Sequence, residues 1–221
     1  MINPKKVIVI AAHFDDVEIN CGGTLAVLAR MGCEIKIIIV SRGQYYDVTG
    51  NLVRTSLKAE SECKKALKKI ELPKINLVCL GFDDTKIIFD ANLIQLIERE
   101  LITYQPDLIL THWLYDTHQD HLNTAQAVVA AARYYYNIFF WEPIYPSGRN
   151  NVNCFKPQIY FDISDFRNKK IRALACYKTQ VNKFKDYGFD WLNGVSARAA
   201  FRGFESGCRA AEAFYVYRLK L

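Results

Sequence analysis

The chain has 221 residues, enough for one α/β domain with a sizeable core and short for two. Hydrophobic residues make up 51% and charged residues 24%, and no run of about 18 apolar residues occurs, which excludes a membrane span and a signal peptide from the prediction. The net charge of +6 is spread over separated lysines and arginines, and no basic block alternates with aromatic residues, which argues against a nucleic-acid partner.

The apolar and amphipathic segments alternate along the chain as in an α/β protein, with Gly32, Gly81 and Pro106 marking boundaries. In chain order they predict a strand over 6–12, a helix over 23–31, a strand over 34–41, a loop over 42–51, a helix over 57–70, a strand over 75–80, a helix over 92–104, a strand over 107–111, a helix over 122–135, strands over 137–141 and 158–163, a helix capped by Asp165 and running to 177, a helix over 191–202 and a strand over 214–219.

Strands that alternate with helices predict a single Rossmann-like domain over residues 1–221, with a doubly wound, mostly parallel sheet and helices on both faces. In the common strand order 3-2-1-4-5, the first and fourth strands are neighbours at the switch point where ligands bind. Seven scattered cysteines without a C-x-x-C pair argue against a disulfide framework and predict a cytoplasmic protein.

Two clusters of histidine and aspartate follow the first and fourth predicted strands. His13, Asp15 and Asp16 come directly after the first, and the cluster 118–121, His-Gln-Asp-His, follows the fourth about a hundred residues later. The predicted topology brings both clusters to one edge of the sheet. Imidazole and carboxylate together suit zinc, and a catalytic zinc has three protein ligands and one open position. The sequence therefore predicts a metal site with a catalytic carboxylate beside it.

Other candidates have ordinary explanations. His112 is the one histidine outside the two clusters and lies at the end of the fourth strand. We interpret Asp83, Asp84 and Asp116 as turn or cap residues on the side of the site. The segment 21–24, Cys-Gly-Gly-Thr, fits neither glycine-rich phosphate-binding pattern, and we interpret it as close packing at a helix start.

The clusters resemble the motifs of a known family. AAHFDDVEINCGGTLA (residues 11–26) is similar to the A-H-P-D-D-x-E-x-G-C-G-G-T-L-A signature of the PIG-L/LmbE-type zinc-dependent N-acetylglucosamine deacetylases, and DTHQDHLNTAQAVVAAAR (116–133) to their second motif. YFDISDFRNKKIRALACYKTQ (160–180) and ARAAFRGFESGCRAAEAF (197–214) resemble later family segments, so the similarity covers nearly the whole chain. The departures are Phe14 for proline, Asn20 for glycine, Ala210 for tyrosine, and a helix start at which Arg54 and Lys58 do not match the family's arginine pattern.

The resemblance implies that His13, Asp16 and His121 bind one zinc ion per chain and that Asp15 is the general base. It implies that His118 stabilises the tetrahedral intermediate or acts as an acid. Asp120 would orient His118 from behind. Candidate substrate contacts are Arg42, Trp113, Trp141, Glu142 and Arg202.

These residues imply a hydrolase that removes the acetyl group from an N-acetylated amino sugar, either a small molecule or a glycoconjugate. One alternative is a nucleotide-sugar-binding transferase that holds Mg²⁺ or Mn²⁺ on Asp15 and Asp16, although the histidines of the second cluster argue against such a hard-cation site. The other is a non-catalytic, metal-stabilised sugar-binding protein, in which Asp15 would have no purpose. The sequence leaves the sugar and the oligomeric state open, a homo-oligomer included.

Overall fold

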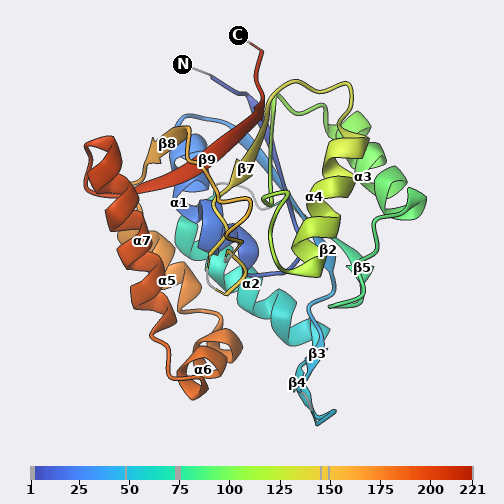
Figure 1. Ribbon diagram of the computed structural model, residues 1–221, viewed down its shortest axis with the longest axis vertical. Coiled ribbons are helices and arrows are strands. Elements are labelled where there is room, and N and C mark those ends of the chain that lie inside the picture. The colour runs from blue at the N-terminus through green and yellow to red at the C-terminus, as the bar shows by residue number, and fades with distance from the viewer. Residues whose placement is uncertain (1–2, 48, 73–75, 145, 149, 221) are drawn as a thin grey trace.

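A seven-stranded sheet ordered β5-β2-β1-β6-β7-β9-β8 forms the centre of the computed structural model, which describes residues 3–47, 49–72, 76–144, 146–148 and 150–220 (Figure 1). The first five strands in this order run parallel, and β9 runs antiparallel to both of its neighbours. The strands are β1 (Lys6–Ala11), β2 (Glu34–Ser41), β5 (Asn76–Phe82), β6 (Leu108–Thr111), β7 (Ile138–Trp141), β8 (Ile159–Asp162) and β9 (Ala211–Arg218).

Helices cover both faces of this sheet, as predicted (Figure 1). One layer holds α1 (Asp16–Arg30), α2 (Ser56–Ile70), α5 (Arg167–Leu174) and α7 (Trp191–Ser206), and the other holds α3 (Ala91–Tyr104) and α4 (Gln119–Ala131). A two-stranded hairpin, β3 (Tyr45–Tyr46) with β4 (Leu52–Arg54), and the short helix α6 (Lys178–Asp186) complete the fold. No helix in the described part of the chain is long and apolar enough to cross a membrane.

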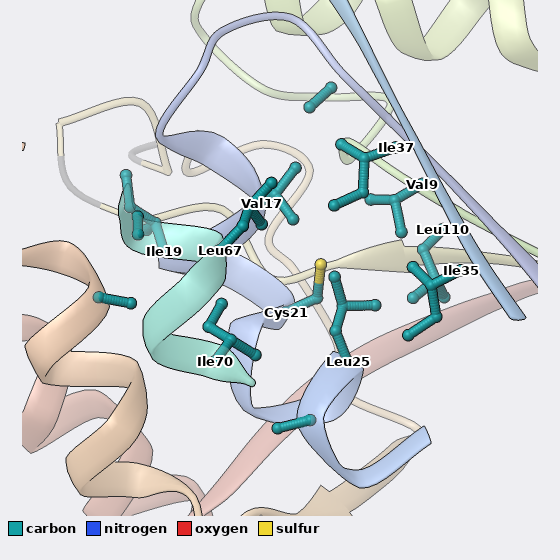
Figure 2. Close-up of a cluster of buried hydrophobic side chains, with 14 of the residues drawn as sticks. Val9, Val17, Ile19, Cys21, Leu25, Ile35, Ile37, Leu67, Ile70 and Leu110 are labelled. Atoms are coloured by element: carbon teal, nitrogen blue, oxygen red, sulfur yellow. The ribbon is translucent and has the colours of Figure 1, made fainter. Parts of the chain in front are cut away.

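Alternating side chains of the central strands fill two separate cores, one on each face of the sheet. In β1, Val7 and Val9 point into the core beneath α1 and α2, while Ile8 and Ile10 point into the core beneath α3 and α4. Figure 2 shows the first of these cores, where Val9 and its neighbours on β2 and β6 face the apolar side of α1. Burial on both faces explains why β1 is a continuous apolar run.

The predicted order 3-2-1-4-5 is confirmed, because the first five predicted strands are β1, β2, β5, β6 and β7. Residue 75, the predicted start of the third strand, lies outside the described residues. The hairpin β3–β4 and helix α6 were not predicted, since their segments are too short for a periodic pattern. The helix capped by Asp165 was predicted too long: α5 begins after Phe166 and ends at Leu174, and Asp165 instead pairs with Arg30 and Arg209 at the surface.

Helix α1 begins at Asp16, seven residues before the predicted start at Gly23, so the first cluster lies on the opening turn of a helix. In the middle of α1, the N–H groups of Gly23 and Thr24 donate to the Glu212 carboxylate, at 2.9 and 2.6 Å. Such anion binding is typical of a helix start, and the predicted boundary coincides with it. A Cβ atom on Gly23 would lie 2.7 Å from Ile163, which confirms the interpretation of close packing.

A buried ion pair ties α1 to α5 and β9. The Lys170 ammonium lies 2.5 Å from Glu212, with each side chain 3% exposed, and donates to the Ile19 carbonyl at 2.7 Å. Lys170→Met should therefore lower the free energy of unfolding by about 3–5 kcal/mol, because it leaves a buried carboxylate without its counter-charge. Urea denaturation followed by circular dichroism measures this loss.

The matched control is the adjacent Lys169, whose ion pair with Glu71 is largely exposed on the Glu71 side. Lys169→Met should cost no more than about 1 kcal/mol, as exposed pairs do. Equal losses in the two variants would contradict the assigned role of the buried pair.

Candidate active site

The two sequence clusters meet at the carboxyl ends of β1 and β6, which are neighbours at the switch point of the sheet. The turn after β1 carries His13, and Asp15 and Asp16 open helix α1. Helix α4 starts within the second cluster, with His118 as its N-cap and His121 on its first turn. The convergence predicted from the topology is therefore confirmed.

Three side chains converge with the spacing of a metal site. His13 Nδ1 lies 3.2 Å from His121 Nε2, and the Asp16 carboxylate lies 3.4 Å from the first nitrogen and 3.3 Å from the second. Ligand atoms around a tetrahedral zinc with bonds of 2.0–2.1 Å are separated by about 3.3–3.4 Å. The residues present thus fit a tetrahedral cation at the position that the family resemblance implied.

A carboxylate holds the outward nitrogen of each histidine. His13 Nε2 contacts Asp120 at 3.0 Å, and His121 Nδ1 contacts Asp116 at 3.0 Å. Asp116 also accepts the His118 N–H at 2.8 Å. Carboxylates in this position fix the ring and the tautomer of metal-binding histidines. Asp116, interpreted from the sequence as a turn or cap residue, therefore belongs to the site.

The structure places Asp120 differently from what the resemblance implied. Its carboxylate contacts His13 and accepts the backbone N–H groups of Thr85 and Ile87, at 2.7 and 3.3 Å. Only its backbone N–H contacts the His118 ring, at 3.2 Å. The carboxylate of this first-turn residue of α4 lies against the loop after β5, so Asp120 orients His13 and not His118.

Sequence reasoning also missed His112. This ring is fully buried, stacks on the His121 ring at 4.1 Å between centroids, and lies 3.3 Å from Asp16. Its Nε2 accepts the Ala12 N–H at 2.9 Å. Burial and the neighbouring His121 lower its pKa to about 4, so the ring is neutral. Its place at the end of β6, beside the switch point, was the available signal.

The charges of the site favour a cation. Against the effect of burial, Asp16 and Asp116 raise the pKa of His121 to about 9, and Asp120 and Asp16 hold the pKa of His13 well above its usual value. The three carboxylates thus draw positive charge into the position between the histidines. A metal ion binds there in place of these protons, so its affinity should fall as the pH falls.

Asp15 differs from its neighbour Asp16. Its side chain makes no capping hydrogen bond and lines the cavity that opens above the metal ligands. Burial and the adjacent Asp16 charge raise the pKa of Asp15 above its usual value. A carboxylate that faces a cavity, with a raised pKa and a free side chain, is suited to accept a proton.

His118 faces the same cavity as a neutral hydrogen-bond donor. Because its Nδ1 accepts the Asp120 N–H at 3.2 Å, the proton of the neutral ring is on Nε2. Burial, together with His121 and His13, lowers the pKa of His118 to about 4. An Nε2–H group of this kind can stabilise an oxyanion.

The cavity has a volume of about 630 Å³ and is larger than the cluster of catalytic groups at its floor. Its walls include residues from the two elements that were not predicted, the β3–β4 hairpin and the α6 region: Tyr45, Tyr46, Arg54, Gln180, Lys183, Phe184, Tyr187, Phe189 and Trp191. Their short segments carry no periodic signal, so sequence reasoning overlooked them.

The five candidate substrate contacts lie outside the cavity lining. Trp113 and Trp141 are buried in the two cores. Arg202 pairs with Glu142 at 2.5 Å beneath α7, and Arg42 pairs with Asp83. Each charged member is held by a partner within the protein, which explains its place in the structure without a ligand.

Comparisons with known proteins support the motif resemblance. The family model described as PIG-L, GlcNAc-PI de-N-acetylase, matches residues 8–132. The diacetylchitobiose deacetylase of Thermococcus kodakarensis is 26% identical over 225 residues, covering 94% of this chain and 81% of that protein.

Two solved structures share the fold at lower identity. The N,N'-diacetylchitobiose deacetylase of Pyrococcus horikoshii superposes with a TM-score of 0.78 at 21% identity, over 97% of this chain and 84% of that one. GalB, the 4-carboxy-2-hydroxymuconate hydratase of Pseudomonas putida KT2440, superposes with a TM-score of 0.80 at 17% identity, over 98% of both chains. The same fold therefore also carries a hydratase, so the reaction has to be argued from the site.

Proposed function

The chain belongs to the PIG-L family of de-N-acetylases, and from this premise we propose that it hydrolyses the acetamide of an N-acetylated amino sugar of the N-acetylglucosamine type. The observation that carries the proposal is the triad of His13, Asp16 and His121 with Asp15 beside it at the floor of a cavity. Hydrolysis adds water across the amide bond and gives acetate and the free amine.

We propose zinc as the metal, one ion per chain. Two imidazoles and one carboxylate form a ligand set that zinc favours, and three protein ligands are typical of catalytic zinc sites. When bound, zinc polarises the amide carbonyl and lowers the pKa of a coordinated water to about 7.

Asp15 and His118 carry out the proton transfer and the charge stabilisation. Asp15 accepts the proton of the attacking water, and its raised pKa allows it to pass that proton to the leaving amine. His118 donates its Nε2–H to the oxygen on which negative charge develops. Of the two roles implied for His118, its tautomer favours oxyanion stabilisation.

The pH dependence of turnover tests this division of roles. Turnover should fall as the pH drops through the pKa of Asp15, because protonated Asp15 cannot act as a base, and this limb should lie above the pH of about 3.9 at which an ordinary aspartate titrates. His118 should stay neutral across the neutral range. His118→Ala should therefore lower kcat by about 10²–10³-fold at every pH and leave the shape of the profile unchanged. If this variant lost the alkaline limb, His118 would be the acid instead.

An acetate-release assay over a panel of N-acetyl sugars, with and without chelator, tests the proposed reaction. Acetate and amine should appear in equal amounts and only with metal. A protein that instead hydrates an unsaturated acid, or transfers a sugar from a nucleotide, would release no acetate.

Two further expectations accompany this function. The seven cysteines form no disulfide, which supports a cytoplasmic location. A single sheet contains strands from both ends of the chain, which supports one domain over residues 1–221. The oligomeric state stays open.

A further inference from the structure

We propose that Arg54, Lys183 and Tyr45 form an anion-binding subsite in the cavity, so that the group attached to the amino sugar carries a carboxylate or a phosphodiester. This inference rests on the proposed function, because it names the class of substrate that the deacetylase would take. All three side chains line the same cavity as Asp15 and His118.

Arg54 is a buried cation without a counter-charge in direct contact. Its residue is 2% exposed, and its Nε donates to the Gly43 carbonyl at 2.8 Å. Its Nη1 is buried and has no hydrogen-bond partner, and the guanidinium is in no ion pair with the described residues. A buried charge without a partner costs several kcal/mol. An acidic group on the substrate would provide that partner.

Lys183 adds a second positive charge to the same wall. Its Nζ lies 5.0 Å from the centroid of the Tyr45 ring, and the Arg54 guanidinium carbon lies 5.2 Å from it, so two cations contact one aromatic ring. Across residues 3–220, the stretches outside the structural description excepted, Lys183 has no ion-pair partner either. By contrast, Lys169 and Lys170 on α5 are both paired with glutamates.

The other charges of the cavity do not neutralise this wall. Asp16 and Asp116 interact with the histidines, and Asp84 accepts the Gly43 N–H at 3.1 Å. Asp15 is the remaining acid, and Arg54 acts on it at longer range. If Arg54 served only to balance Asp15, its removal would affect every substrate alike, and Lys183 would not matter.

A matched pair of substrates separates these cases. One is the carboxymethyl glycoside of N-acetylglucosamine and the other is its methyl ester, which differs only in charge. We expect kcat/KM for the acid to exceed that for the ester by at least about tenfold. The difference should appear in KM, because a group remote from the amide binds equally well before and during the reaction. The corresponding methyl phosphodiester forms a third arm, which shows whether carboxylate or phosphate is preferred.

Variants assign the preference to the subsite. Lys183→Met and Arg54→Gln should each reduce the preference for the acid and leave the metal content unchanged. Lys185→Met is the matched control, because Lys185 lies on the same helix, is exposed and does not line the cavity. Equal kcat/KM for acid and ester in the wild type, or variants that lower both substrates equally, would overturn the proposal.

Failure of the proposed function would be recognisable separately, because no substrate would then release acetate. In that case, calorimetric binding of the acid and of the ester to the metal-loaded wild type and to Lys183→Met decides the question. Tighter binding of the acid that is lost in the variant supports the subsite, and equal binding of both compounds overturns it.

Discussion

Asp15→Asn should lower kcat by about 10²–10⁴-fold while the protein keeps its full metal content, because this change removes the general base and no metal ligand. Asparagine has the size of aspartate but cannot accept a proton at neutral pH. The Asp15 side chain faces the cavity without a capping bond, so its replacement disturbs little else. Steady-state kinetics and elemental analysis of the same preparation measure both effects.

A nearby acid provides the control for this variant. Asp84 lines the cavity but holds the Gly43 N–H, so Asp84→Asn should keep most of the turnover. An Asp15→Asn protein as active as the wild type would remove Asp15 from the mechanism. A protein that loses its metal would make Asp15 a ligand, and Asp16 would become the candidate base.

His121→Ala should remove both the metal and the activity. Its Nε2 is one of three proposed ligand atoms, and its loss also leaves Asp16 and Asp116 without their partner. We expect metal affinity to fall by more than the 10–100-fold that changes to the supporting carboxylates cause. Metal content after dialysis against a weak chelator, followed by an activity assay, measures the effect.

His118→Ala is the matched control for the ligand assignment, because His118 and His121 lie on the same face at the start of α4. The account expects this variant to retain its metal while losing turnover. A fully metal-loaded His121→Ala protein would show that the ligand set is wrong.

The sheet and the meeting of the two clusters were predictable from the sequence because strong local signals determine them. Buried strands such as β1 are uninterrupted apolar runs, and the right-handed crossover rule then leaves few ways to order them. Once β1 and β6 are neighbours, His13 and His121 have to lie at the same edge. This part of the site follows from topology alone.

The supporting residues of the site were not predictable in the same way. His112 and Asp116 are single polar residues in a loop, and their roles depend on contacts with rings that the sequence does not locate. Asp120 was assigned to the wrong histidine because the direction of its side chain depends on where α4 begins. The cavity wall was missed because Arg54 and Lys183 lie on a hairpin and a helix too short to leave a periodic pattern.

Titration of the metal-free protein with Zn²⁺, with acetate release measured at each point, is the most direct test of the central claim that this metal centre hydrolyses an N-acetyl group. The account predicts no acetate without metal, activity that rises in proportion to bound zinc, and a plateau at one ion per chain. Full acetate release from the metal-free protein, or none at any zinc loading on a panel of N-acetyl sugar conjugates, would contradict it.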